Sequence, residues 1–383
     1  MRDLRYDRLA GLILDHSFEL GDRDVLRIDA AAAATPLIAA LHRGAVERGT
    51  HAYANVELEG LRELLVTIGS DEQLDFVSPI ARREIDRVDA VVTIWSETNT
   101  RSFTRLDPAR HQRHLAALRQ LAVRARDRIA RGELQWCGTL SPTDGHAQDA
   151  EMSLGEYEDF VFRACHATDD DPVAHWRARG RELQARAASL AAVRELRIVG
   201  EDTDLRVPVA GRSWRGSYGL RNMPDGEVYT SPVETGAEGT IRFGFPAVFE
   251  GREVEDVRLR FDGGRVVQAE AAVGEPYLAA LLDIDAGART LGEVAFGLNY
   301  EIDRFTRNIL FDEKIGGTLH LALGMGFEDL GGKNRSSLHL DLICDLRRDG
   351  EVYADGELIW RNGCFLEPAK AEVRDERAVE RVG

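Results

Sequence analysis

The sequence predicts an α/β N-terminal domain followed by a strand-rich α+β C-terminal domain. The chain has 383 residues, which is longer than a domain with a single hydrophobic core usually is, so we expect two domains. The first half alternates helical and extended segments, which is typical of parallel strands joined by crossover helices. From about residue 193 the apolar period changes to two, which is typical of strands. We therefore predict domains of residues 1–188 and 189–383, with a polar, alanine-rich stretch before the boundary.

The elements of the first domain follow from apolar spacing. Apolar residues at helical spacing predict helices, and short apolar runs between turn residues predict strands. The expected helices are residues 4–15, 35–48 and 108–132, with further helices within residues 153–191. The expected strands are residues 24–28, 52–56, 88–95 and 134–140.

Alternation of apolar and polar residues dominates the second domain. The expected strands are residues 195–199, 205–209, 227–230, 240–243, 257–261 and 265–272, with others near Leu319 and Leu338. One helix is expected over residues 275–286. The charged last fifteen or so residues are expected to be loosely held.

Composition narrows the class of protein. The formal net charge is -17, and the arginines are mostly interleaved with acidic residues, so no basic surface for a nucleic acid is indicated. The four cysteines lie far apart and form no C-x-x-C pair. No apolar stretch approaches the roughly 20 residues that span a bilayer. We expect a cytoplasmic protein that binds neither nucleic acid nor membrane.

The clearest candidate for chemistry is the pair His339 and Asp341. Alternation in residues 337–343 places both on one face of a strand, opposite a face of leucines. Imidazole nitrogen and carboxylate oxygen are both standard zinc donors. A hydrogen-bonded pair or a solvated face explains the same pattern, so both interpretations remain open.

Four further residues interrupt apolar or turn segments of the second domain. Together with that pair they make three glutamates, two histidines and one aspartate, with no obvious set of lysines or arginines beside them: Glu227, Glu293, Glu313, His320, His339 and Asp341. An unpaired charge in apolar surroundings is costly, and divalent cations are natural partners for such a set. From the residues alone, a metal site and a structural hydrogen-bonding role remain alternatives.

These residues lie in motifs that resemble those of the leucyl aminopeptidase T family. Glu227 stands at the ligand position of the family's first motif, and Glu293 stands at the position of the glutamate shared between the metals. The likeness spans nearly the whole chain. The matching segments are residues 152–161, 222–232, 274–276, 291–293, 311–320 and 334–341.

The resemblance implies a homodimeric metal-dependent aminopeptidase with its metal centre enclosed in the second domain. Such an enzyme removes N-terminal residues from peptides or aminoacyl amides with water activated by two divalent ions, here zinc, cobalt or manganese. The implied ligands are Glu227, Glu293, Glu313, His320, His339 and Asp341. Glu293 would bridge the ions, and Glu293 or Glu313 would carry the proton to the leaving amine.

Two departures from the family pattern stand out. Six residues separate Glu313 from His320, more than in the better-known members. Phe327 stands where those members carry a tyrosine near the metals. A phenylalanine neither binds metal nor donates a hydrogen bond to a developing oxyanion. The implied ligand set is intact, but one expected hydroxyl is missing.

Three alternatives remain beside the aminopeptidase. Ring-cleaving dioxygenases that act on hydroxylated pyridines look distantly related in fold, and they use one ferrous iron. His320, His339 and Asp341 would supply the two histidines and one carboxylate that such an iron prefers. The others are a specialised amidase and a non-catalytic relative. The three glutamates favour two metals over one.

Overall fold

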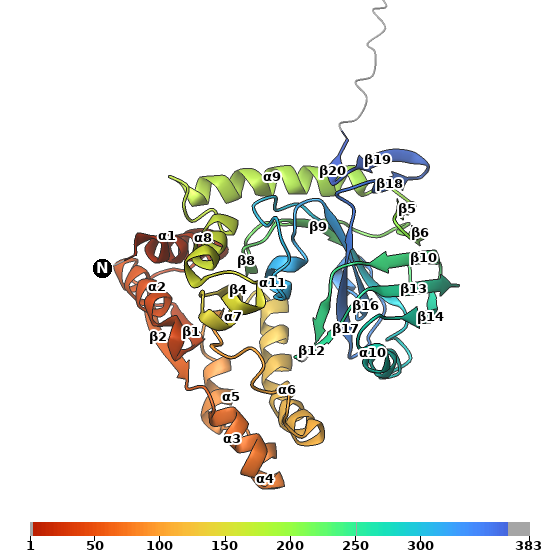
Figure 1. Cartoon of the computed structure of the whole chain (residues 1–383). Helices are drawn as coiled ribbons and strands as arrows, with labels where there is room; N and C mark the ends of the chain where they lie inside the picture. The colour runs from red at the N-terminus through yellow and green to blue at the C-terminus, as the bar shows by residue number, and fades with distance from the viewer. Residues whose placement is uncertain (1–2, 250, 367–383) are drawn as a thin grey trace, which may run out of the picture.

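The structure, a computed structural model, describes residues 3–249 and 251–366 (Figure 1). In Figure 1 the parallel sheet and its helices lie on one side, and antiparallel strands lie on the other. Helix α9 (Pro172–Leu190) runs along the top of both. This mixture of a parallel sheet with large antiparallel sheets confirms the predicted α/β character. The chain end that was expected to be loosely held, from residue 367, lies outside the described residues.

The first half is a parallel sheet with helices on both faces. Its strands run in the spatial order β2 (His51–Glu57), β1 (Val25–Ala31), β3 (Ala90–Trp95), β4 (Gln135–Leu140) and β8 (Asn222–Met223). One face packs against α1 (Leu4–Leu12), its π-helical continuation (Ile13–Ser17), α2 (Thr35–Glu47) and α8 (Leu154–Ala164). The other face packs against α5 (Pro79–Ile85) and α6 (Pro108–Ala130). A 3-10 turn (Ala32–Ala34) precedes α2, and α7 (Asp144–Asp149) follows β4.

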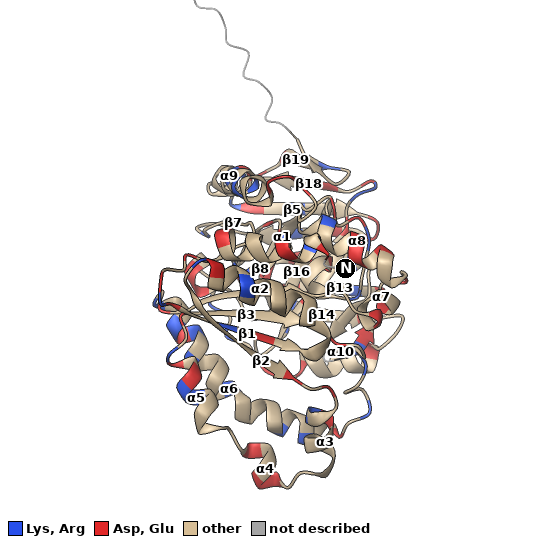
Figure 2. Ribbon diagram, turned by 90° about the vertical axis from the view of Figure 1, so that its left-hand side faces the viewer, with Lys and Arg blue, Asp and Glu red and all other residues tan. Residues whose placement is uncertain are grey.

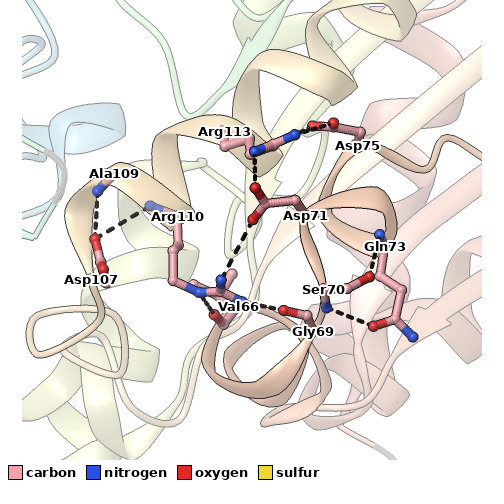
Figure 3. Close-up of polar contacts among 10 residues, drawn as sticks. All are labelled: Val66, Gly69, Ser70, Asp71, Gln73, Asp75, Asp107, Ala109, Arg110 and Arg113. Atoms are coloured by element: carbon pink, nitrogen blue, oxygen red, sulfur yellow. Dashed lines mark hydrogen bonds and ion pairs between the residues drawn. The ribbon is translucent and has the colours of Figure 1, made fainter.

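Helices between β2 and β3 were missed by the sequence-based assignment. They are α3 (Leu61–Ile68), α4 (Asp71–Asp75) and α5. These helices are short, and apolar residues of α3 such as Leu61 and Ile68 are exposed, so no buried stripe marks them in the sequence. Figure 3 shows that side chains of α6 hold α3 and α4: Arg113 donates from Nε to Asp75 at 2.7 Å, and Arg110 donates from Nε to the carbonyl of Val66 at 2.7 Å.

The second half contains two large antiparallel sheets around one core. The eight-stranded sheet has the order β14 (Arg265–Glu270), β13 (Val257–Asp262), β10 (Glu238–Phe243), β6 (Thr203–Pro208), β5 (Glu195–Gly200), β18 (Glu351–Ala354), β19 (Glu357–Arg361) and β20 (Cys364–Phe365). The five-stranded sheet has the order β17 (His339–Asp345), β16 (Thr318–Gly324), β15 (Leu291–Gly297), β9 (Glu227–Thr230) and β7 (Arg215–Ser217). Both sheets contribute one apolar face to the shared core.

Shorter elements complete this half. They are the hairpin β11 (Ala247–Phe249) and β12 (Arg252–Val254), helices α10 (Glu275–Leu282) and α11 (Ile309–Asp312), and a 3-10 turn (Glu328–Leu330). Helix α10 ends four residues earlier than predicted, before Asp285 accepts hydrogen bonds from the backbone of Gly287 and Ala288. The predicted strands are otherwise present within a few residues of their expected bounds.

The two halves interlock across the predicted boundary. Leu183, Ala187 and Leu190 of α9 pack into the core of the antiparallel sheets. In the opposite direction, β8 returns from the second half and pairs with β4 of the parallel sheet. Because elements cross between the halves in both directions, the predicted boundary between domains 1–188 and 189–383 stays a prediction.

Acidic and basic positions are interspersed over the molecule. Figure 2 shows both colours scattered along the ribbon. On α6 and next to it, Arg124 pairs with Asp86 at 2.7 Å and Arg131 pairs with Glu133 at 2.8 Å. Within residues 3–249 and 251–366, no helix combines the length and the apolar character needed to cross a membrane.

Candidate metal centre

One face of the five-stranded sheet carries the predicted ligands. Residues directly opposite each other in an antiparallel pair point to the same face. The opposed pairs on this face are Glu227 with Gly297, His320 with Ala295, Asp341 with Ala322 and His339 with Gly324, and Glu293 follows the alternation of β15. The alternate residues, such as Val294, Leu321 and Leu340, are buried in the apolar core on the other face. The alternation predicted for His339 and Asp341 is thus confirmed.

Small residues form the floor between these side chains. Ala295, Gly297 and Ala322 occupy the positions of the same face that lie between the candidate ligands. None of them carries more than a methyl group. Over Gly297 the backbone packs closely, because a Cβ there would lie 2.4 Å from the carbonyl oxygen of Ile315.

Glu313 reaches the site from outside the sheet. It caps the C-terminus of α11, whose own first turn is fixed by the Asn308 side chain accepting from the backbone N–H of Leu310. The chain then turns at Gly316 and Gly317 into β16. Ligand atoms of Glu313, His320 and Asp341 all lie within 4.8 Å of one another.

Glu293 lies between two groups of ligands. Its Oε1 is 3.7 Å from His320 Nε2, which is itself 3.6 Å from Glu227 Oε2. Its Oε2 is 3.3 Å from His339 Nε2, which is 3.4 Å from Asp341 Oδ1. Two ligand atoms bonded at about 2.0–2.2 Å to one tetrahedral ion are about 3.3–3.6 Å apart. One carboxylate therefore presents one oxygen to each of two positions with metal-like spacing.

The hydrogen bonds around the site leave candidate metal-binding atoms without a partner. Among the described residues, the buried atoms Glu227 Oε2 and Asp341 Oδ1 have no hydrogen-bond partner. His339 Nδ1 lies 3.0 Å from the carbonyl oxygen of Met325, to which only a protonated nitrogen donates. This contact places a hydrogen on Nδ1, so Nε2, which faces Glu293 and Asp341, would be the nitrogen that binds a metal ion in exchange for its proton. Unpaired oxygens and an oriented imidazole fit a divalent cation.

The ionisable groups perturb one another strongly. Burial raises the pKa of Glu227 well above its usual value, although Lys314 opposes this shift. Burial would lower the pKa values of His320 and His339, but their carboxylate neighbours outweigh it and raise them to about 9 and about 12. Burial likewise opposes ionisation of Glu293, whose pKa His320 and His339 hold below the usual value. The carboxylates and imidazoles of the cluster therefore lie close enough to shift one another's pKa values.

Lys314 is a functional residue that sequence reasoning missed. The sequence showed no obvious set of lysines or arginines beside the ligands, but one lysine lies among them: Lys314 is fully buried and its ammonium pairs with Glu313 Oε1. Burial would lower the pKa of Lys314, but Glu313, Glu227 and Asp225 outweigh it and raise the pKa. A usable indication was present: Lys314 directly follows Glu313, and the chain has only two other lysines, Lys333 and Lys370.

A second His and Asp cluster has a structural explanation. His166 Nδ1 and His175 Nδ1 lie 3.1 and 3.2 Å from one oxygen of Asp169. The two imidazole rings are stacked, with centroids 3.6 Å apart and planes inclined by 21°. Both nitrogens approach one carboxylate oxygen at hydrogen-bonding distance, so a shared carboxylate accounts for the cluster.

Two cavities meet beside the candidate ligands. The smaller one, of about 150 Å³, is lined by His339 and Asp341 together with apolar side chains that include Phe249 and Phe305. The larger one, of about 500 Å³, lies against α6 and α10. Phe249 lines both, and Leu338 of the larger cavity directly precedes His339 of the smaller one. The two cavities are therefore neighbours, one at the candidate ligands and one between α6 and α10.

Comparison with known families and proteins agrees with this geometry. The family model described as thermophilic metalloprotease (M29) matches residues 3–365. Aminopeptidase T of Thermus aquaticus is 35% identical over 231 residues, so the chain spans about half the length of that relative (54%) and 52% of this chain is covered. Aminopeptidase 2 of Geobacillus stearothermophilus is 27% identical over 401 aligned positions, which cover 93% of this chain and 96% of the relative.

Two solved structures share the fold. Wild-type AmpT from Thermus thermophilus superposes with a TM-score of 0.85 at 25% identity, covering 95% of this chain and 99% of that one. 2,5-Dihydroxypyridine dioxygenase from Pseudomonas putida superposes with a TM-score of 0.57 at 14% identity, covering 95% and 97%. The second likeness shows a common fold alone.

Proposed function

This chain belongs to the thermophilic metalloprotease (M29) family, and we propose that it is an aminopeptidase whose candidate centre holds two divalent metal ions. The observation that carries the proposal is the position of Glu293. One of its oxygens faces the group of Glu227 and His320, and the other faces the group of His339 and Asp341. A carboxylate shared in this way suits a pair of ions better than a single one.

The six predicted residues divide between the two positions. Glu227, Glu293 and His320 would hold one ion, and Glu293, His339 and Asp341 would hold the other, with Glu313 within reach of both through His320 and Asp341. Zinc, cobalt and manganese are the metals that a mixed carboxylate and imidazole set suits. Bound there, such ions polarise a carbonyl group and lower the pKa of water.

Glu313 is the group we assign to proton transfer. Its side chain keeps 18% of its surface exposed, whereas that of Glu293 keeps 5%, so Glu313 is the more accessible of the two glutamates proposed for this role. Lys314 fixes Glu313 Oε1 and leaves Oε2 to accept a proton and to return it to the leaving amine. Lys314 is thus a positioning residue.

Selection of a free N-terminus would follow from the α-amino nitrogen of the substrate. A free amine has a lone pair for a metal ion and hydrogens for a carboxylate, whereas the amide nitrogen of an acetylated terminus has no available lone pair. The first side chain of the peptide would enter the small cavity next to His339, and the remaining peptide would continue past Phe249 into the larger cavity.

The test is cleavage of dipeptides and aminoacyl amides by the purified protein, with the N-acetylated forms of the same compounds alongside. We expect release of the first residue from the free substrates only. Equal cleavage of the acetylated forms would show an amidase without terminal selection. Absence of cleavage from every substrate would contradict the aminopeptidase itself.

The single-iron dioxygenase has less geometric support. Such an iron needs both histidines and one carboxylate around one point. Among the described residues, no candidate group unites His320 and His339, because each lies with a different set of carboxylates. Oxygen uptake by the iron-loaded protein with a hydroxylated pyridine would favour this alternative.

A further inference from the structure

Phe327 and Tyr229 form an aromatic pair beside the candidate metal centre. Their ring centroids are 5.2 Å apart and their planes are inclined by 68°. Phe327 also contacts the ring of His339, with centroids 5.8 Å apart. The backbone N–H of Phe327 donates to Ser231 Oγ at 2.7 Å, which holds the segment against β9. One ring therefore links the His339 imidazole to a phenol.

The register of the sheet directs Tyr229 to the face of the ligands. Tyr229 lies two residues after Glu227 on β9, so both side chains leave the strand on the same side. Across the sheet, Tyr229 is opposite Ala295 of β15, and Ala295 is opposite His320 of β16. Only the methyl group of Ala295 stands on this face between the phenol and the imidazole. The backbones of Tyr229 and His320 are roughly 10 Å apart, two strand spacings.

The surroundings of Tyr229 supply no second phenol. Ser231, directly after β9, lies opposite Glu293 of β15 when the register is continued by one pair beyond Thr230. Arg215 lies opposite Tyr229 on β7, and its guanidinium donates to the phenol oxygen and pairs with Asp329 at 2.7 Å, so the phenol hydrogen stays available. Phe327, which packs on both Tyr229 and His339, carries no hydrogen-bond donor in its side chain. Among these residues, Tyr229 supplies the phenol on this side of the cluster.

We propose that Tyr229 donates a hydrogen bond to the substrate carbonyl oxygen as negative charge develops on it. The inference rests on the proposed aminopeptidase function. The phenol keeps its proton throughout, and no bond to Tyr229 forms or breaks. A preorganised donor aimed at a developing oxyanion stabilises the transition state more than the bound substrate, so it raises kcat and leaves KM nearly unchanged.

The test is Tyr229→Phe, which keeps the ring and removes the hydroxyl. We expect kcat for a dipeptide to fall about 100-fold, with KM and metal content unchanged, because the loss of one oxyanion donor costs about 10²–10³ in kcat. A phosphonamidate analogue of the dipeptide, which mimics the tetrahedral oxyanion, should lose affinity by a similar factor. The product amino acid should bind as before. Tyr53→Phe, on β2 away from the site, is the matched control.

The second variant moves the hydroxyl group from position 229 to position 327. In Tyr229→Phe/Phe327→Tyr the phenol stands on the neighbouring ring, and we expect at least tenfold recovery of kcat over Tyr229→Phe. A purely structural tyrosine would instead give variants with altered thermal stability and unchanged kcat. Wild-type cleavage with unchanged kcat and unchanged phosphonamidate affinity in Tyr229→Phe would overturn the inference. Absence of cleavage by the wild type would overturn the proposed function, and this inference with it.

Discussion

At the scale of single residues, Glu293 has the most demanding position. It is 4% exposed, lies on a central strand and faces an imidazole with each oxygen. A buried carboxylate without a cation is expensive, so its ionised form depends on the groups around it. The two histidines and the proposed ions all act on this one side chain.

The first prediction concerns Glu293→Gln. The amide keeps the shape of the side chain but loses the negative charge that two ions would share. Metal content of the purified variant, measured by plasma mass spectrometry, should fall from two ions per chain to one or fewer, and peptide cleavage should fall at least 100-fold. Glu195→Gln, an exposed change on β5, is the control. Two retained ions in Glu293→Gln would rule out a bridging role.

The second prediction concerns Lys314→Met. Removing one partner of a buried ion pair leaves an uncompensated charge and costs about 3–5 kcal/mol. The free energy of unfolding of the metal-stripped protein, measured in urea, should fall by that amount because Glu313 and Glu227 lose their cation. Bound metal should restore part of the loss. Lys333→Met, in an exposed loop, is the control, and equal stability of the two variants would argue against Lys314 as the internal cation.

The sequence identified the six acidic and imidazole residues but not how charge is balanced among them. Alternation in residues 337–343 was enough to place His339 and Asp341 on one face, because a strand has a fixed period of two. The neighbours of Lys314 could not be anticipated in this way. Asp225 and Glu227 are about ninety residues away in the chain, and only the tertiary fold brings their carboxylates near its ammonium.

At the scale of elements, β15 is shaped by a glycine just before Glu293. The register of β15 and β16 shifts between Leu291 and Glu293. A Cβ on Gly292 would lie 2.1 Å from the carbonyl oxygen of Met325. That oxygen accepts from His339 Nδ1, so the close approach of two backbones helps to orient a candidate ligand.

The third prediction therefore concerns Gly292→Ala. The added methyl group must displace the Met325 carbonyl and with it the His339 ring. Metal affinity, measured by competition with a chelator, should fall about 10–100-fold, the usual effect of losing an outer-shell partner. Gly155→Ala in α8, where a Cβ meets nothing within 4 Å, should leave metal affinity unchanged. Unchanged metal affinity in both variants would show that Gly292 does not help to orient the candidate ligands.

The fourth prediction concerns the cavity between α6, α10 and the β11–β12 hairpin. None of the described residues that line it has a carboxylate, and Arg252 lies over the Tyr277 ring with 5.2 Å between the guanidinium carbon and the ring centroid. Arg252→Gln should lower kcat/KM about tenfold for tripeptides with a free C-terminus, because it removes a charge-assisted hydrogen bond. The C-terminal amides should be unaffected. Arg206→Gln on β6 is the control, and equal losses for acids and amides would exclude carboxylate binding at Arg252.

Long, strongly patterned elements were predictable, and short ones were not. Helix α6 was expected almost within its observed bounds, since Asp107 and Pro108 mark its start and apolar spacing continues to its end. Strands β7 and β8 have three and two residues, too few to show a period. Their places in the sheets depend on pairing partners far away in the chain, which local patterns do not contain.

At the scale of the whole molecule, the site depends on both halves. Phe311, next to Asp312 and Glu313, packs in the core of the first half, whereas β15, β16 and β17 belong to the core of the second. The sequence predicted two folding units but not this interlocking. The implied homodimer stays a prediction, which light scattering of the purified protein would check.

The fifth prediction follows from this shared site. A ligand that binds only the folded protein stabilises it by about 4 kcal/mol at roughly a thousand times its Kd. Stripping metal should therefore lower Tm, and adding zinc, cobalt or manganese should raise it again. In His339→Ala the same additions should give a much smaller rise in Tm. An equal rise in this variant would place the stabilising ion elsewhere.

The most direct test of the two-ion aminopeptidase is a stepwise metal titration of the stripped protein. Bound metal per chain and release of the N-terminal residue from a dipeptide would be followed in the same samples. We predict little cleavage at one equivalent of zinc, cobalt or manganese and full cleavage as the second equivalent binds. Full cleavage at one equivalent, or none at two with any of these metals, would contradict the account.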